Sequence, residues 1–192
     1  MNKRENILNI AANLFVEKGF NATSMKDIAL KTGIEAASLY NHIQSKQEIL
    51  SVLLLRIADR FCEGIQSIEK KSITSEAQIK KAIQLHLTIA VKNKELTYLI
   101  LQDWKHLKEK KKVEFLQKRN LYQEKFKNLL EKAMEDGVVK KGNPEIMRNN
   151  ILSVLRWTYN QDLYNHPTTF QSTEFEKEIL SFIFSGILEK SN

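Results

Sequence analysis

Residues 24–46 read S-M-K-D-I-A-L-K-T-G-I-E-A-A-S-L-Y-N-H-I-Q-S-K, and this stretch decides the fold. Ser24 is a favoured helix N-cap residue, and Asp27, three positions later, is a weaker version of the acid in a capping box. Gly33 allows a tight turn without a Cβ penalty. A second short helix is predicted over about residues 35–42. Two short helices joined by a turn with glycine predict a helix-turn-helix, whose second helix enters the DNA major groove.

A first helix is predicted to precede this motif, over residues 3–18. Gly19 is well placed to end it in the left-handed conformation. A further helix begins at Lys46 without a linker, and its apolar stripe continues to about residue 70. Such continuity allows a rigid helix to carry movement from a distant core to the helix-turn-helix. The apolar residues of the first helix recur at helical spacing: Ile7, Leu8, Ala11, Leu14 and Phe15.

The composition favours an all-α protein. Its 192 residues are 42% hydrophobic, and two prolines and six glycines leave few places to break helices. We expect a three-helix DNA-binding domain over residues 1–46 and a helical-bundle domain over residues 47–192. The two domains together should hold about nine helices. The later ones are predicted over residues 76–91, 95–107, 110–136, 144–165 and 173–189.

Cysteine usage and charge indicate the compartment and the partner. Cys62 is the single cysteine and cannot form an internal disulfide, which suits a reducing cytoplasm. No apolar run approaches the length of a transmembrane helix, and the N-terminus enters an amphipathic helix without a signal-peptide core. We therefore expect a cytoplasmic protein with no membrane partner. The net charge of +7 favours a polyanionic partner, although this excess alone proves nothing.

Residues 7–50 resemble the N-terminal domain of the TetR family of bacterial transcriptional regulators. The stretches that carry the resemblance are I-L-N-I-A-A-N-L-F-V-E-K-G-F, T-S-M-K-D-I-A and T-G-I-E-A-A-S-L-Y-N-H-I-Q-S-K-Q-E-I-L. The most specific part is the L-Y-x-H-(hydrophobic)-x-x-K string at residues 39–46. The rest of the chain resembles the family in plan, as a helical domain for ligand binding and dimerisation. The resemblance implies a double-stranded DNA operator, a small-molecule effector and a homodimer.

The second short helix has small and polar residues at its N-terminal end, so its backbone can approach base edges. Ala36 and Ala37 can contact thymine methyl groups, and Ser38 can bond a base or a phosphate. Glu35 either accepts from a cytosine amino group or favours the helix N-terminus, and the second role fits better.

The resemblance implies phosphate contacts for Tyr40 and His42, and it makes Asn41 a candidate base reader. Two alternatives stay open. Tyr40 could be a core residue, because tyrosine is often buried. His42 could instead cap the end of its helix.

Four more residues are predicted to contact DNA. Thr23 and Ser24 should meet a phosphate at the N-terminus of the preceding helix, where free N–H groups favour an anion. Lys26 should project toward the groove, and Lys46 should anchor the far DNA backbone. Taken alone, both lysines would be read as solvated charges.

The carboxy-terminal region is predicted to hold an effector pocket between helices, because ligand pockets are commonly lined by aromatic side chains and a few polar groups. The alternative is that these aromatic residues are plain core. The candidate lining residues are Tyr98, Trp104, His106, Arg119, Tyr122, Phe126, Trp157 and Tyr159.

A basic run lies beside these candidates, H-L-K-E-K-K-K at residues 106–112. Its first interpretation is a solvated face. The functional alternative is an anionic effector such as a fatty-acyl or other acyl-coenzyme A, whose phosphates would meet the lysines. The stretches W-K-H-L, R-N-L-Y-Q-E-K-F and R-W-T-Y-N-Q-D-L-Y weakly resemble TetR-family regulators of lipid and acyl-CoA metabolism.

Dimerisation is expected through the last two helices, at about residues 144–165 and 173–189. Two-fold dimers read paired DNA half-sites, whereas a single helix-turn-helix offers few base contacts. An interface of this kind needs apolar residues beyond the core stripe. The candidates are Leu152, Leu180, Phe184 and Leu188.

The sequence thus predicts a ligand-responsive regulator that is not an enzyme and has no cofactor. We expect a repressor, released when its effector shifts the population to a conformer that does not fit the operator. An activator, or a regulator without an effector, remains the alternative. A helical metal-dependent enzyme is the third reading, because Asp103, His106 and Glu109 would share one helical side. Metal sites of that kind need such residues from two helices, and the sequence has no second set.

Overall fold

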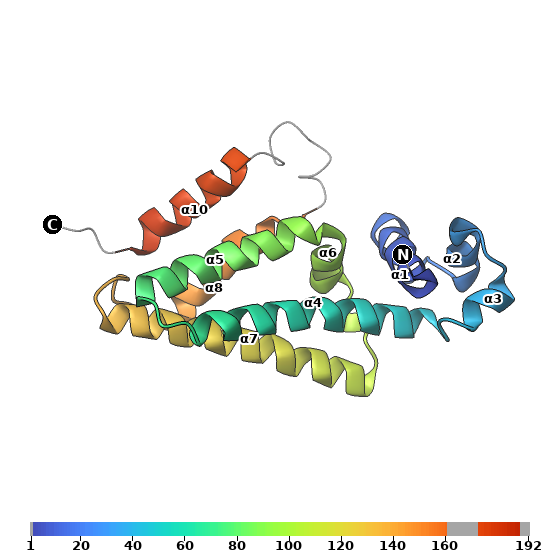
Figure 1. Ribbon diagram of the computed structural model, residues 1–192, viewed down its shortest axis with the longest axis horizontal. Helices are drawn as coiled ribbons and strands as arrows, with labels where there is room; N and C mark the ends of the chain where they lie inside the picture. Colours follow the sequence, from blue (N-terminus) through green and yellow to red (C-terminus); the bar gives the residue numbers. More distant parts are fainter. Residues whose placement is uncertain (1, 161–172, 189–192) are drawn as a thin grey trace. The chain divides into compact units, whose positions relative to one another are not determined.

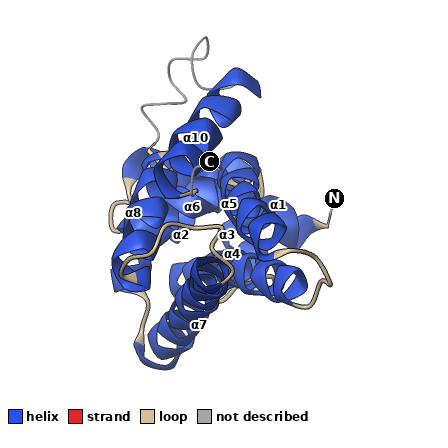
Figure 2. Cartoon of the chain, turned by 90° about the vertical axis from the view of Figure 1, so that its left-hand side faces the viewer, coloured by secondary structure: helices blue, strands red, loops and turns tan. Residues whose placement is uncertain are grey.

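The computed structural model describes residues 2–160 and 173–188, and both ranges are helical (Figures 1 and 2). Within them the β-type pairing is a single isolated antiparallel bridge between Val139 and Leu188. The prediction of an all-α fold is confirmed. The helices are α1 (Lys3–Lys18), α2 (Met25–Thr32), α3 (Ala36–Tyr40), α4 (Lys46–Glu69), α5 (Ser75–Lys92), α6 (Lys94–Gln102), the 3₁₀ helix η1 (Trp104–His106), α7 (Glu109–Glu135), α8 (Pro144–Trp157) and α10 (Thr173–Ile187).

The chain forms two compact units. Unit 1 comprises residues 1–58 and 95–117, and unit 2 comprises residues 59–94 and 118–192. The helices α4 and α7 each contribute their first part to unit 1 and the remainder to unit 2. From the sequence we expected the DNA-binding domain to end at residue 46. That boundary between functions stays a prediction.

The core of unit 1 joins the helix-turn-helix to residues from much later in the chain. The apolar stripe of α1 is buried as predicted, and the side chains of Leu39 and Ile43 lie in the same cluster. Leu99, Leu107 and Phe115 complete this cluster. A three-helix module of about 45 residues buries too little surface to be stable alone, and these later residues supply the missing apolar contacts.

The segment between α6 and α7 differs from the prediction. A single helix was expected over residues 95–107, but α6 ends at Gln102 and a 3₁₀ turn follows. In this turn the amides of His106 and Leu107 donate to the carbonyls of Asp103 and Trp104, and Trp104 stacks on Phe115 of α7 with ring centroids 6.4 Å apart. As a result, Asp103, His106 and Glu109 do not share one helical side. No group of three or more metal-ligating side chains occurs within the described ranges.

The ends of two helices also differ from expectation. Gly19 ends α1 with φ 84° and ψ 151°, which has the expected positive φ but lies outside the left-handed helical region. The helix α8 begins as predicted at Pro144, because the Asn143 side chain accepts from the amides of Glu145 and Ile146 at 2.9 and 3.1 Å. It ends at Trp157 rather than near residue 165, and residues 161–165 of the prediction lie outside the described ranges.

One of the residues predicted for the dimer interface lies in the core instead. Leu152 is fully buried within unit 2 and therefore cannot meet a second chain. Leu180, Phe184 and Leu188 are partly exposed, and Phe182 of α10 is far more so, at 68%. An amphipathic stripe does not separate core from interface positions when both are apolar.

Candidate functional site

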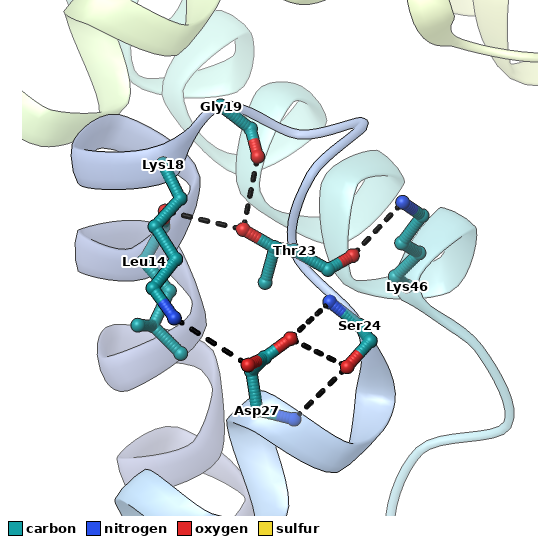
Figure 3. Close-up of polar contacts among 7 residues, drawn as sticks. All are labelled: Leu14, Lys18, Gly19, Thr23, Ser24, Asp27 and Lys46. Atoms are coloured by element: carbon teal, nitrogen blue, oxygen red, sulfur yellow. Dashed lines mark hydrogen bonds and ion pairs between the residues drawn. The ribbon is translucent and has the colours of Figure 1, made fainter.

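The N-terminus of α2 is fixed by a complete capping box. The Ser24 hydroxyl oxygen accepts from the amide of Asp27 at 3.1 Å, and the Asp27 carboxylate accepts from the amide of Ser24 at 2.8 Å (Figure 3). The same carboxylate accepts the Ser24 hydroxyl proton. The hydrogen bonds from Ser24, with smaller help from Lys18, lower the pKa of Asp27 to about 2. The weaker capping box expected from the sequence is therefore fully formed.

Thr23 faces the protein rather than solvent. Its side chain is buried, and its hydroxyl donates to the carbonyls of Gly19 at 2.9 Å and Leu14 at 3.2 Å, at the end of α1 (Figure 3). The Gly19 carbonyl also accepts from the backbone amide of Thr23 at 3.2 Å, so both the side chain and the amide of Thr23 bind the end of α1. The structure thus assigns the Thr23 hydroxyl to the end of α1, which corrects the expected phosphate contact.

Lys46 also has a different partner from the one expected. Its ammonium donates to the backbone carbonyls of Phe20 at 2.7 Å, Asn21 at 3.1 Å and Thr23 at 2.9 Å. The nitrogen lies 4.6 Å from the centre of the Phe20 ring. An ammonium group has three N–H donors, and all three are used here. Lys46 therefore fastens the turn between α1 and α2 to the start of α4. Its role as a DNA anchor stays a prediction.

The short helix α3 presents its polar side chains to solvent. Leu39 is fully buried and holds the helix on the core, and the backbone turns into it through the left-handed residue Gly33 at the end of α2. Tyr40 is 46% exposed, so the alternative that it is a core residue is wrong. The other predicted DNA contacts of this helix are exposed or half-buried: Ala36, Ala37, Ser38, Asn41 and His42.

An open cleft of about 570 Å³ lies at the N-terminus of α2. Five predicted DNA contacts line it, namely Thr23, Ser24, Lys26, Tyr40 and Lys46. The α3 residues 36–38, with Asn41 and His42, do not line it. Five lining residues were not predicted, namely Asn21, Ala22, Met25, Gln44 and Ser45. The position of Gln44 and Ser45 between Tyr40 and Lys46 was the available signal.

Three predicted effector residues belong to unit 1. Tyr98 and Trp104 pack against its hydrophobic core. The His106 ring stacks on Phe20 with centroids 5.4 Å apart, and its backbone carbonyl accepts from the Gln47 side chain at 3.1 Å. His106 thus touches the same phenylalanine that lies under the Lys46 ammonium.

The other predicted effector residues belong to unit 2, where a histidine missed by the sequence analysis connects two of them. Tyr122 and Tyr159 each place a hydroxyl 2.7 Å from a ring nitrogen of His86, at Nδ1 and Nε2 respectively. All three side chains are buried. Burial, with the charge of Arg156, lowers the pKa of His86 to about 3, so the imidazole is neutral near neutral pH. We call these three residues the Tyr–His–Tyr group.

Two other predicted effector residues of unit 2, Phe126 and Trp157, differ in burial. Phe126 is fully buried, with its ring centre 6.1 Å from that of Tyr122. Trp157 is 49% exposed and packs against Phe175 of α10 at 6.1 Å. Trp157 is therefore not part of the buried cluster. Nothing in the sequence marks His86, because it is a single histidine within the apolar stripe of α5.

The arrangement defines a helix-turn-helix regulator of transcription, and comparison with known proteins identifies its family. Residues 7–53 match the family described as bacterial regulatory proteins, tetR family, and residues 72–160 match the one described as tetracyclin repressor-like, C-terminal domain. The chain belongs to the TetR family of DNA-binding transcriptional regulators. It is a regulator and not an enzyme.

One sequence relative and two solved structures are similar to this chain. The HTH-type transcriptional repressor KstR2 of Rhodococcus jostii (strain RHA1) is 24% identical, over 99% of this chain and 93% of that protein. The ketosteroid transcriptional regulator KstR2 of Mycobacterium tuberculosis has a similar structure, with a TM-score of 0.88 at 18% identity over 98% of this chain and 96% of that one. AibR, solved in complex with isovaleryl coenzyme A and operator DNA, has a TM-score of 0.79 at 18% identity over 96% and 97%.

No helix within the described ranges is long and apolar enough to cross a membrane.

Proposed function

We propose that the protein is a homodimeric repressor that leaves a palindromic operator when a small anionic molecule binds, with an acyl-coenzyme A as the first candidate. The observation that carries the DNA-binding part is the cleft at the N-terminus of α2, where Lys26 and Tyr40 lie beside the free amides of a capped helix. This combination of a cation, a hydroxyl and a helix N-terminus suits a DNA phosphate. A protein with this partner works in the cytoplasm of a bacterium.

The reading of bases is assigned to the exposed side of α3. Ala36, Ala37 and Ser38 offer methyl groups and a hydroxyl to the major groove. Asn41 offers an amide that can bond adenine, and His42 offers an imidazole to the backbone. The phosphate contact of Ser24 is proposed to form only if its hydroxyl proton turns from Asp27 to the phosphate, because both of its donors bind Asp27 in the free protein.

The effector part is supported by charge and by the relatives. AibR was solved with isovaleryl coenzyme A, and a relative of similar length is named a repressor. In this chain the run of lysines at the start of α7 supplies positive charge, although Lys111 is paired with Glu114 at 2.9 Å and Lys112 lies 5.6 Å from the centre of the Trp104 ring. Lys108 and Lys110 are exposed and can meet a phosphate.

The dimer is proposed to form through α8 and α10. An open apolar hollow of about 510 Å³ lies between them in unit 2. Phe182 and Ile146 line it and are 68% and 61% exposed, which is unusual for such large apolar side chains on a monomer. A self-complementary apolar patch on two neighbouring helices suits a two-fold interface.

The test uses the full chain and a DNA site selected from random sequence. Fluorescence anisotropy should show binding to a palindrome, and octanoyl- or palmitoyl-coenzyme A should release the DNA. Release by the free fatty acids alone would contradict the coenzyme A assignment. Tighter DNA binding on addition of any of these compounds would contradict release as the mechanism.

A further inference from the structure

The segment between α6 and α7 belongs to the same unit as the helix-turn-helix. Residues 95–117 are part of unit 1, although they come long after the DNA-binding motif in the sequence. Leu99, Leu107 and Phe115 of this segment are buried in the core that also holds the motif. Because these apolar side chains fix the segment in unit 1, the exposed side chains between them keep a set place beside the motif.

This segment meets the motif next to the cleft at the N-terminus of α2. The His106 ring lies 5.4 Å from the centre of the Phe20 ring, and its backbone carbonyl accepts from Gln47 at 3.1 Å. The Lys46 nitrogen lies 4.6 Å from the centre of the same Phe20 ring. Lys46 and Asn21, the residue after Phe20, both line the cleft. The cleft and the turn that carries His106 are therefore joined through one phenylalanine.

The exposed surface of this turn is positively charged. Lys105 and Lys108 flank His106 and are exposed. The buried Asp103 pairs with His106 at 3.6 Å and interacts with Lys105 through charge alone. The next exposed acid, Glu109, is followed by three lysines. Within the described part of the chain no carboxylate forms an ion pair with Lys105 or Lys108, so both ammonium groups can take an external anion.

We propose that Lys105 and Lys108 contact operator phosphates that flank the phosphate held at the α2 cleft. Each DNA strand carries one phosphate per about 3.4 Å of helix axis, so a phosphate in the cleft has close neighbours on the same strand. Exposed charges attract each other over about 8 Å at physiological ionic strength, which suits lysines beside a residue that shares Phe20 with the cleft. The DNA surface of unit 1 then extends beyond the helix-turn-helix.

This inference rests on DNA binding by the family and not on the proposed effector. It gives Lys108 a phosphate of the DNA in place of a phosphate of the effector. Phosphate contacts position a protein on the duplex without reading its sequence. The two lysines should therefore strengthen binding to every DNA sequence by a similar factor.

The experiment measures the salt dependence of operator binding by the full chain, using anisotropy titrations at several salt concentrations. Lys105→Gln and Lys108→Gln should each lower the slope of log K against log salt by about one per bound chain, and the double variant by about two. Arginine at both positions keeps the charge and should keep the slope. Lys70→Gln, at an exposed lysine of unit 2, makes the same charge change and should behave as the wild type.

Shortened duplexes locate the phosphates involved. The operator is trimmed by one base pair at a time from both ends. At the step that removes the flanking phosphates, the wild type should lose affinity and the double variant should not. Thermal unfolding should be the same in all the variants, because the two lysines are exposed and outside the core.

An unchanged slope in both single variants, or an equal decrease in Lys70→Gln, would overturn the proposal. A wild-type slope together with a higher concentration of octanoyl-coenzyme A needed for release would assign Lys108 to the effector and also overturn it. A reduced slope in the two variants, with no release of the wild type by any coenzyme A compound, contradicts the proposed effector and leaves the DNA contact standing.

Discussion

The ammonium of Lys46 donates a 2.9 Å hydrogen bond to the backbone carbonyl of Thr23, across 23 residues of sequence (Figure 3). Thr23 immediately precedes the N-cap of α2, and Lys46 is the first residue of α4. The bond therefore ties the start of one DNA-facing helix to the start of the helix that leads away from the motif. We infer that Lys46 positions the helix-turn-helix rather than touching the DNA itself.

Lys46→Met should weaken operator binding without changing its salt dependence. The variant loses three hydrogen bonds from a charged donor, so the free energy of unfolding should fall by roughly 1–3 kcal/mol. Lys26→Met should instead lower the slope of log K against log salt by about one, because a phosphate contact releases counterions. Anisotropy titrations at several salt concentrations compare the two. A reduced slope in Lys46→Met with unchanged stability would show that Lys46 reaches a phosphate.

Tyr40→Phe should weaken operator binding and leave the protein as stable as the wild type. Its hydroxyl stands at the cleft beside α2, and the residue is 46% exposed, so folding does not depend on it. The loss should be about three- to ten-fold, as for one hydrogen bond. Thermal unfolding with anisotropy gives both quantities. Equal operator affinity in Tyr40→Phe and the wild type would show that the Tyr40 hydroxyl does not bind the DNA.

The helix-turn-helix could be predicted because its signals are local. A serine with an acid three residues later, and a glycine at the turn, act over a few residues, and the capping box and the left-handed Gly33 follow directly from them. The partners of Thr23 and Lys46 were not predicted, because they are backbone carbonyls at the end of α1 and in the following turn. A sequence pattern does not show which way a side chain at a helix end will point.

The Tyr–His–Tyr group could not be predicted, for a related reason. His86 meets Tyr122 and Tyr159 from 36 and 73 residues away, so the group exists only once three helices are packed. Both tyrosines were candidates for the effector pocket, but a single histidine in an apolar helix carries no motif. Such partners depend on how the surfaces of several helices pack together, and the periodicity of one helix does not contain this information.

Acidification should destabilise the protein through His86. Its folded pKa, about 3, lies below the unfolded value, so the unfolded chain binds the extra proton between these two values. Stability is therefore full above the unfolded pKa and falls as the pH drops toward 3. The free energy of unfolding should decrease by about 2 kcal/mol between pH 7 and pH 5 from this residue alone.

Urea unfolding at the two pH values measures this effect, and two variants identify its source. His86→Gln keeps a donor and an acceptor for the tyrosines but cannot titrate, so most of the pH dependence should disappear. His106→Gln, in the turn after α6, should retain it. An equal pH dependence in the wild type and His86→Gln would show that His86 is not the group responsible.

Phe182→Glu should convert the dimer into a folded monomer. The side chain is 68% exposed and lines the hollow between α8 and α10, so a carboxylate there costs little in a single chain. In a dimer the same carboxylate would be desolvated against apolar groups, and the dissociation constant should rise about thirty-fold or more. Light scattering after gel filtration measures the mass. Leu101→Glu, at an exposed leucine of α6, is the matched control and should remain dimeric. If Phe182→Glu dimerises as well as this control, the interface lies elsewhere.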